Sequence, residues 1–250
     1  MTDLAVWLVV LVPALAVATA CASGLSATTA DAANRVGAVA VAVAALALSA
    51  IGLQRDHALS GTLYLVDARG ACFLAVVAVV GLTSALLSPR YLDGAGRSMF
   101  TPARARRSYY ASFHLFWAAL LAVPLVSNLG VAWLLVEATT AASALLVAFS
   151  GRRSALEAGW KYLVLTSMGL TVALFGLVMV YVQTAAAGGG LSALRYAELG
   201  RAAPRFDHDA ALVAFLLLMA GLATKIGWAP VHNWLPDAHS EAPAPVSALL

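Results

Sequence analysis

Long apolar runs recur along almost the whole chain, and they constrain its fold more than any other feature. A helix needs about 20 mainly apolar residues to cross the hydrocarbon layer of a membrane. Seven runs reach about this length: Leu4 to Ala22, Val36 to Leu53, Gly70 to Leu87, Tyr110 to Ser127, Leu129 to Phe149, Trp160 to Thr184 and Ala210 to Trp228. Of the 250 residues, 62% are hydrophobic and only 11% are charged, which is far from the balance of a soluble domain. We therefore predict an integral membrane protein.

The runs also indicate which kind of membrane fold to expect. Inside lipid the backbone must pair within the protein, so only helices and closed barrels span a membrane. The alternation of apolar and polar residues that marks barrel strands is absent from these runs. The sequence predicts an all-α, polytopic transmembrane bundle of about seven to eight helices, with a break in the seventh.

The first run has small residues near Cys21, as a secretion signal would. It opens with Asp3 rather than with the positive segment that a signal needs, so we interpret it as a membrane helix. Cys21 and Cys72 lie in or beside apolar runs, where a packed thiol is the ordinary situation. We assign neither cysteine a role.

Charged loops predict the orientation of the bundle, because short connections rich in Lys and Arg stay on the cytoplasmic side. Arginines gather in two connections, after the third and the fifth run: Arg90, Arg97, Arg104, Arg106, Arg107, Arg152 and Arg153. Both connections are predicted to be cytoplasmic, which puts the N-terminus and the Gly-rich segment 184–209 outside. These arginines account for the net charge of +3, so the expected partner is the lipid bilayer and not nucleic acid.

Glu137 is the clearest ionisable residue at a place where lipid is expected. A charge at the centre of a membrane helix costs about 2.5 to 3.5 kcal/mol on the insertion scale. Thr139, Thr140 and Ser143 follow it, and such small or hydroxylated residues let a neighbouring helix approach and give the carboxylate partners. The alternative is an acid that only holds helices together. We favour a functional role, because acids inside membranes are rare and usually functional.

Lys225 lies near the end of the seventh run, and Gly227 and Pro230 follow it. Proline lacks a backbone N–H and obstructs the preceding turn, so we expect the helix to kink or stop within a turn of the lysine. Broken helices at membrane depth usually line a wet cavity. The alternative is a lysine at a helix end whose long side chain reaches the interface.

Further ionisable residues lie near these two positions. Glu157 and Lys161 stand four apart in the favourable order of a helix ion pair, and both an interfacial pair and a second proton site remain open. After the break come four more: His232, Asp237, His239 and Glu241. Their irregular spacing argues against a metal site, whereas an unperturbed imidazole titrates close to physiological pH. Proton handling is therefore the favoured interpretation, and no metal is predicted.

A carboxylate and a buried ammonium on facing helices can act as a switch. While the two are paired the lysine holds its proton, and when the acid is neutralised or moves away the lysine releases it. With the histidines next along the chain, we predict a proton relay of Glu137, Lys225, His232 and His239. Additional candidates are Lys161, Asp237 and Glu241. Composition and spacing thus predict an ion or proton translocating bundle and nothing finer.

Three stretches resemble a known superfamily: 114–149, 153–181 and 224–250, the last containing "HNWLPDAHSEAPAPVSALL". They are similar to the antiporter-like membrane subunits of NADH:quinone oxidoreductase, Mrp-type cation/proton antiporters and membrane-bound group 4 hydrogenases. The "EATT" and "WKYL" segments are most similar to component F of hydrogenase 4. In that superfamily the fifth-helix glutamate matches Glu137, the seventh-helix lysine matches Lys225, and the histidines that follow match His232 and His239. Lys161 matches a lysine at the start of the sixth helix.

The resemblance also implies an organisation. Members have two inverted repeats of five helices, so residues 1–108 are expected to hold helices 1 to 3, and residues 109–250 to hold helices 4 to 7 and the start of helix 8. Because the second repeat is missing, we expect a truncated N-terminal part of such a subunit.

Three functions follow as expectations. The favoured one is a proton (ion) translocating subunit of a redox-driven complex of the hydrogenase 4 or complex I type in the inner membrane. The alternatives are an Mrp-type sodium/proton antiporter subunit and a hydrogenase anchor that moves no ions. The chain has no GxGxxG, no CxxC pair and no P-loop, so no cofactor or catalytic centre of its own is expected. The implied partners are other membrane and peripheral subunits, with protons or sodium as the transported ion.

Overall fold

The computed structural model describes Trp7, Leu11 and residues 14–20, 26–55, 57–94 and 103–250. Six helices in this part of the chain are long and apolar enough to cross a membrane. They are α2 (Ala27–Leu53), α3 (Ala68–Gly94), α4 (Ala103–Ala122), α5 (Leu129–Val147), α6 (Arg153–Thr184) and α8 (His208–Ile226). The predicted all-α, multi-pass membrane bundle is confirmed. The first predicted run and Cys21 fall largely outside the described residues.

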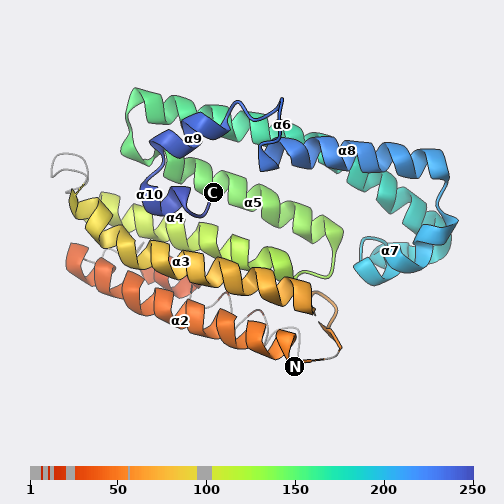
Figure 1. Cartoon of the computed structure of the whole chain (residues 1–250), viewed down its shortest axis with the longest axis horizontal. Helices are drawn as coiled ribbons and strands as arrows, with labels where there is room; N and C mark the ends of the chain where they lie inside the picture. Colours follow the sequence, from red (N-terminus) through yellow and green to blue (C-terminus); the bar gives the residue numbers. More distant parts are fainter. Residues whose placement is uncertain (1–6, 8–10, 12–13, 21–25, 56, 95–102) are drawn as a thin grey trace.

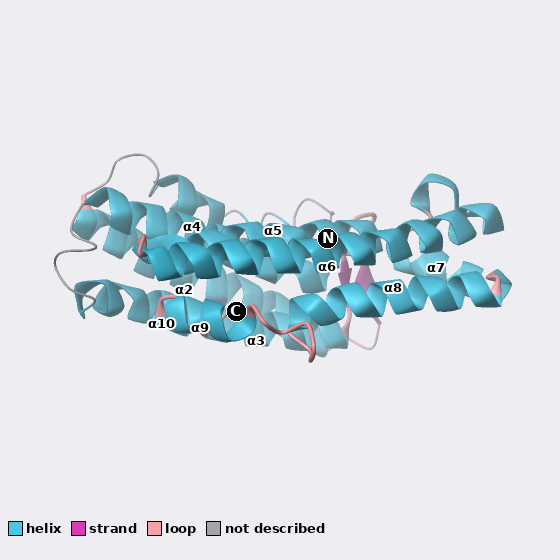
Figure 2. Cartoon of the chain, turned by 90° about the horizontal axis from the view of Figure 1, so that it is seen from above, coloured by secondary structure: helices cyan, strands magenta, loops and turns pink. Residues whose placement is uncertain are grey.

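The long helices run roughly along one common direction, as Figure 2 shows from above. Helices α2 to α6 follow one another across the molecule, and α8 packs along α6 (Figure 1). Cys72 is exposed on α3, so its thiol is not packed in the way that we expected.

Short elements join the long helices. Strands β1 (Leu59–Ser60) and β2 (Leu65–Val66) form an antiparallel hairpin between α2 and α3. The Gly-rich segment folds into η3 (Ala185–Gly189), η4 (Gly190–Ser192), α7 (Tyr196–Ala202) and η5 (Ala203–Arg205). Single 3₁₀ turns, η1 (Val123–Leu125) and η2 (Ala148–Ser150), extend α4 and α5. After α8 come α9 (Leu235–Glu241) and α10 (Ala244–Ser247), on the side of the molecule away from α7 (Figure 1).

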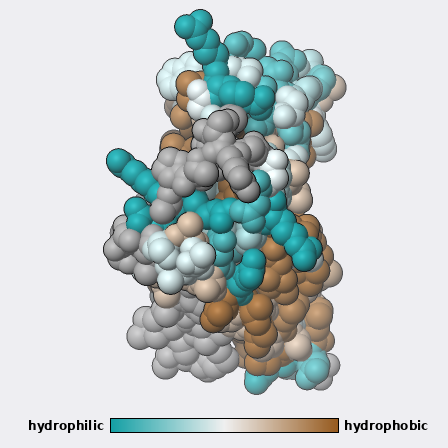
Figure 3. Space-filling view, turned by 90° about the vertical axis from the view of Figure 1, so that its left-hand side faces the viewer, coloured by the Kyte–Doolittle hydropathy of each residue, from teal (hydrophilic) through white to brown (hydrophobic). Residues whose placement is uncertain are grey.

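Several helices continue beyond their apolar runs. Helix α2 begins at Ala27 rather than Val36, and α3 ends at Gly94 rather than Leu87. The added turns are polar and pair with one another, because Arg106 of α4 forms ion pairs with Asp31 and Asp93 at 2.8 and 2.5 Å. Figure 3 looks at this end of the bundle, where hydrophilic residues gather beside hydrophobic surface. Hydropathy predicts which segments lie in lipid, and it does not predict where a helix ends.

A buried polar contact joins α2, α3 and α4, and it begins with a proline. Pro89 lies inside α3 and has no N–H, which leaves the carbonyl of Ala85 without its helical partner. Asn34 Nδ2 donates to that carbonyl at 2.8 Å. The amide oxygen of Asn34 then lies 2.9 Å from Nε2 of the fully buried His114. The proline therefore fixes the amide orientation, and with it the donor role of His114 Nε2.

Helices α6 and α8 approach each other closely through small residues. A Cβ added to Gly221 of α8 would lie 2.4 Å from both the Gly169 carbonyl oxygen and the Ala173 nitrogen of α6. Only a glycine permits this backbone contact, which is the kind that packs membrane helices without a hydrophobic driving force. Because Lys225 lies one turn after Gly221, the contact turns the lysine towards α6.

Helix α8 ends within one turn of Lys225, as expected, although Gly227 rather than Pro230 occupies its terminus. Gly227 adopts a left-handed conformation (φ 80°), and the N–H groups of Gly227 and Trp228 both donate to the Ala223 carbonyl. The next carbonyl, that of Thr224, accepts from the indole of Trp234 at 2.8 Å. Pro230 lies beyond the helix, in the segment that leads to α9.

Replacing Gly227 with alanine should destabilise the protein by about 1–2 kcal/mol, the cost of a left-handed conformation for an L-residue. The new Cβ would make only ordinary contact with Leu235 at 3.4 Å, so the penalty is conformational. Thermal unfolding in detergent measures it. Gly200→Ala is the matched control, because that helical glycine of α7 has open space around it and should tolerate a Cβ. Equal midpoints for Gly227→Ala and the wild type would contradict this account of the helix end.

Candidate functional site

Three helices meet around the ammonium group of Lys225. Its Nζ donates to Thr140 Oγ1 of α5 at 2.9 Å and to the Tyr162 hydroxyl of α6 at 2.7 Å. The same Nζ lies 5.0 Å from the centre of the Tyr162 ring. These two distances put the ammonium at the hydroxyl end of the ring and not above its face. The hydrogen bond, rather than a cation–π attraction, therefore holds Lys225 here.

The hydroxyl groups around Lys225 continue into α5. Tyr162 is fully buried, and its hydroxyl lies 2.8 Å from Ser143 Oγ. Ser143 donates in turn to the Thr139 carbonyl at 2.6 Å. All of these acceptors are neutral. The ammonium is thus held by oxygen atoms that carry no full charge.

Glu137 lies on α5, one turn before Thr140. Its Oε1 accepts a hydrogen bond from Ser167 Oγ of α6 at 2.5 Å, and its Oε2 is buried with no partner among the described residues. The ion pairs found in the described part of the chain do not join Glu137 to Lys225. The two ionisable residues that the sequence analysis selected therefore lie in one cluster without touching.

Two tryptophans lie next to residues of this cluster, one in space and one along α5. Trp234, from the segment after the helix end, is buried with its ring centroid 4.8 Å from that of Tyr162. Trp133 of α5, one turn before Glu137, donates its indole N–H to the Leu170 carbonyl of α6 at 2.8 Å. The segment that follows α8 thus covers the tyrosine that binds Lys225.

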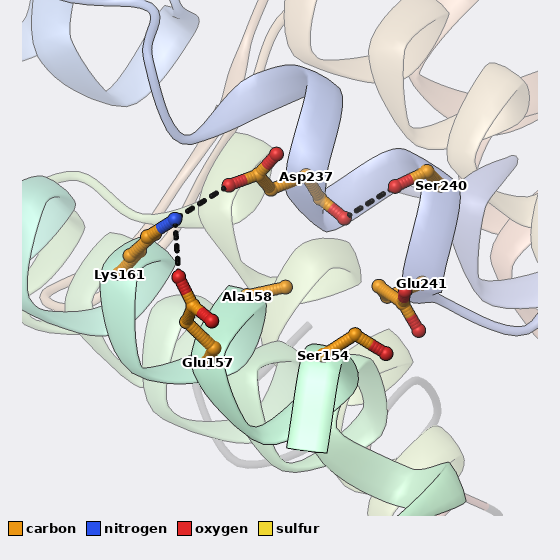
Figure 4. A pocket seen from close by; sticks show the side chains of 7 residues that line it. All are labelled: Ser154, Glu157, Ala158, Lys161, Asp237, Ser240 and Glu241. Carbon is orange, nitrogen blue, oxygen red and sulfur yellow. Dashed lines mark hydrogen bonds and ion pairs between the residues drawn. The ribbon is translucent and has the colours of Figure 1, made fainter. Parts of the chain in front are cut away.

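A second ionic group lies at the surface, between the start of α6 and α9. Lys161 pairs with Glu157 at 2.7 Å, in the predicted helix pair, and also with Asp237 of α9 at 3.1 Å. Arg152 pairs with Glu241 at 3.0 Å. Figure 4 shows the pocket, of about 190 Å³, with the Lys161 ammonium between the two carboxylates and Glu241 across from them.

Neither histidine takes part in the hydrogen bonds described for Lys225 and Glu137. His232 is exposed in the segment between α8 and α9. His239 of α9 has its Nδ1 2.7 Å from Ser247 Oγ of α10. The described residues contain no group of three His, Cys, Asp or Glu side chains suited to a metal ion. The structure thus brings Glu137 and Lys225 together, and separately Lys161, Asp237 and Glu241.

Sequence reasoning missed Tyr162 and Ser167 as members of the cluster. A spacing signal was present for Tyr162, because the buried face of α6 repeats at helical intervals: Tyr162, Thr166, Gly169, Ala173 and Gly176. Trp160, two residues before it, is 67% exposed, so these two aromatic residues lie on different faces of α6. For Ser167 the sequence carries no comparable signal.

Comparison with known proteins decides the family. Residues 104–250 match the family described as NADH:quinone oxidoreductase/Mrp antiporter, TM. The chain belongs to this family.

Members with curated names are similar over part of their length. A hydrogenase-4 component F homolog of Methylacidiphilum infernorum is 31% identical over 191 residues, which are 76% of this chain and 40% of that protein. The NADH-quinone oxidoreductase subunit N of Desulforudis audaxviator is 32% identical over 185 residues, which are 74% of this chain and 34% of that one. This antiporter-family chain therefore spans roughly a third to two fifths of the length of these relatives.

Solved structures share the fold. A chain of the membrane-bound sulfane sulfur reductase, an archaeal respiratory membrane complex, superposes with a TM-score of 0.79 at 21% identity. That match covers 97% of this chain and 49% of the other. A chain of the Mrp complex from Dietzia sp. DQ12-45-1b gives 0.78 at 22% identity, covering 98% and 45%. The bundle is thus the antiporter-like fold.

Replacing Tyr162 with phenylalanine keeps the ring against Trp234 and removes the hydroxyl that accepts from Lys225. A hydrogen bond to a charged group is worth about 1.5–3 kcal/mol, so Tyr162→Phe should lower the thermal unfolding midpoint in detergent. Tyr181→Phe is the control, because Tyr181 lies on the same helix and is exposed. If both variants unfold like the wild type, the hydroxyl contributes nothing to holding Lys225.

Proposed function

We propose that the chain is a proton (ion) translocating membrane subunit of a redox-driven complex of the hydrogenase 4 or complex I type. The observation that carries the proposal is the cluster at the end of α8. There a partly buried ammonium meets only neutral hydroxyl groups, while a carboxylate with one unpaired oxygen lies one turn of α5 before Thr140. Intramembrane charges of this kind usually mark ion pathways.

In this proposal Lys225 is the proton carrier and Glu137 is its electrostatic partner. A carboxylate close to the ammonium stabilises the protonated lysine, and neutral oxygens stabilise it less. Movement of Glu137 towards or away from Lys225 therefore changes how tightly the lysine holds its proton. The low polarity of the surroundings makes each such change larger than it would be in water.

The remaining site residues are proposed to connect Lys225 with water. The pocket lined by Lys161, Asp237 and Glu241 is open to solvent and lies between the start of α6 and α9. Lys161 directly precedes Tyr162 in the sequence. His239 of α9 contacts Ser247 of α10, and His232 is exposed between α8 and α9. We propose that these groups together form the path from the surface to the partly buried lysine.

The rest of the organisation is proposed from the relatives. Residues 109–250 would form the first antiporter-like repeat and residues 1–108 the helices before it, which the family match over 104–250 supports. Other membrane and peripheral subunits would supply the redox chemistry, with this chain in the inner membrane. The Mrp-type sodium/proton antiporter is the second candidate, because the matching family description names NADH:quinone oxidoreductase and the Mrp antiporter together. A hydrogenase anchor that moves no ions would leave Glu137 and Lys225 without a purpose.

The orientation is proposed from the arginines, with the starts of α4 and α6 cytoplasmic and α7 outside. A cysteine at Arg104 should react with an impermeant thiol reagent only from the cytoplasm, and a cysteine at Gly200 only from outside. Both positions are exposed, and serines at Cys21 and Cys72 remove the native thiols. Reversed labelling at both positions would overturn the orientation.

Lys225→Ala should abolish proton movement in the reconstituted complex, driven by its electron donor. Loss of a positioned proton carrier costs about 100-fold or more. Lys225→Arg should fail too, because a guanidinium keeps its charge and is not deprotonated in proteins. Proton uptake into proteoliposomes measures both variants. Arg201→Ala, which breaks an exposed pair with Glu198, is the control and should pump normally. Normal pumping by Lys225→Ala would end the proposal.

A further inference from the structure

Helix α6 gives one hydroxyl group to each member of the separated pair. Tyr162 accepts from the ammonium of Lys225, and five residues later Ser167 donates to the carboxylate of Glu137. At 2.5 Å the Ser167 contact has the length of a hydrogen bond to a charged oxygen, which is about twice as strong as a neutral one. Through these two hydrogen bonds α6 holds both the ammonium of Lys225 and the carboxylate of Glu137.

These contacts also leave one acceptor of Glu137 on α5 and one donor of Lys225 on α8 without a partner among the described residues. Glu137 Oε2 is buried without a partner. An ammonium has three N–H donors, and the hydrogen bonds of Lys225 in the described part of the chain go to two oxygens, of Thr140 and Tyr162. Since Thr140 and Glu137 are three residues apart on one helix, their side chains are neighbours. The Lys225 ammonium, which bonds Thr140, is therefore held on the same face of α5 as Glu137, yet the ion pairs of the described residues include no direct pair between the two.

We propose that Ser167 is a positioning residue that holds Glu137 apart from Lys225 and so maintains the open state of the pair. This inference rests on the proposed function of the site and adds the residue that sets its resting position. With the hydroxyl removed, the carboxylate has no donor on α6. It should then turn to the spare N–H of Lys225, because a buried charged oxygen without any donor is unfavourable.

The open state has a functional consequence. A lysine in direct contact with a carboxylate holds its proton more tightly than one that meets only hydroxyl oxygens. Loss of the Ser167 hydroxyl should therefore close the pair and slow the release of the proton. Ser167→Thr keeps a hydroxyl and should behave like the wild type. Ser167→Val has the shape of threonine without the hydroxyl, so threonine and valine form a matched pair of variants.

The sequence makes the geometry directly measurable, because Lys161 and Lys225 are the only lysines in the chain. We would label lysine Nζ with ¹⁵N and glutamate carboxyl groups with ¹³C, reconstitute the chain in lipid vesicles, and measure the ¹⁵N–¹³C dipolar coupling by solid-state NMR. The pair of Lys161 and Glu157, at 2.7 Å, calibrates the signal of a direct contact. Lys161→Arg then removes that signal, so that Lys225 is the one remaining labelled lysine.

In the Lys161→Arg background we expect no contact-strength coupling while Ser167 is present. Ser167→Ala and Ser167→Val should bring the coupling up to the calibrated contact value, and a further Glu137→Gln exchange should abolish it again. Ser167→Thr should leave the coupling at the background level. The inference is overturned if the alanine and valine variants show no gain, or if threonine and valine act alike.

A transport measurement separates this inference from the proposed function. In the reconstituted complex, Ser167→Val should slow proton uptake several-fold and Ser167→Thr should not. The NMR result does not depend on transport, so a gain in coupling together with normal pumping by Lys225→Ala would keep the positioning role and end the transport role. Unchanged coupling together with pumping that requires Lys225 would keep the transport role of Lys225 and end the positioning role of Ser167.

Discussion

The close contact between α6 and α8 is the constraint on which the site depends. Gly221 lies against the backbone of Gly169 and Ala173, and membrane helices that pack through such small residues bring their backbones together. Lys225 follows one turn later, and at this separation its side chain reaches Tyr162 and Thr140 instead of lipid. A larger residue at position 221 would separate the helices and leave the ammonium without its acceptors.

The same physical rule governs the polar contacts elsewhere in the bundle. Pro89 frees the Ala85 carbonyl, Asn34 satisfies it, and His114 Nε2 donates to the amide oxygen that Asn34 presents. In each of these two groups one buried atom, His114 Nδ1 or Glu137 Oε2, has no hydrogen-bond partner among the described residues, and only Glu137 Oε2 lies in the cluster of Lys225. A buried polar atom without a partner is costly, so one such atom beside an ammonium with a spare donor distinguishes a site built to change from a contact built to stay.

Much of the fold could be predicted from the sequence, because apolar runs report directly which segments lie in lipid. Glu137 and Lys225 were identified for the same reason: a charge inside such a run needs a partner. Helix ends could not be read in this way, since the turns at α2, α3 and α4 are stabilised by ion pairs between distant segments. Ser167 escaped notice because a lone hydroxyl in an apolar helix usually bonds its own backbone, and only the packing of α5 on α6 shows that it meets Glu137.

The end of α8 explains how Lys225 can remain charged without touching a carboxylate. The lysine lies in the last turn of the helix, where the aligned peptide dipoles place about half a negative charge. The cap at Gly227 and the Trp234 indole satisfy the carbonyls of Ala223 and Thr224, which are two of the four carbonyls at this helix end. Because Trp234 also packs on Tyr162, the residue that completes the helix end is the one that covers the lysine's acceptor. The helix end therefore supplies the negative end of the helix dipole, which favours the ammonium, and it leads to Trp234, which covers the tyrosine that accepts from the ammonium.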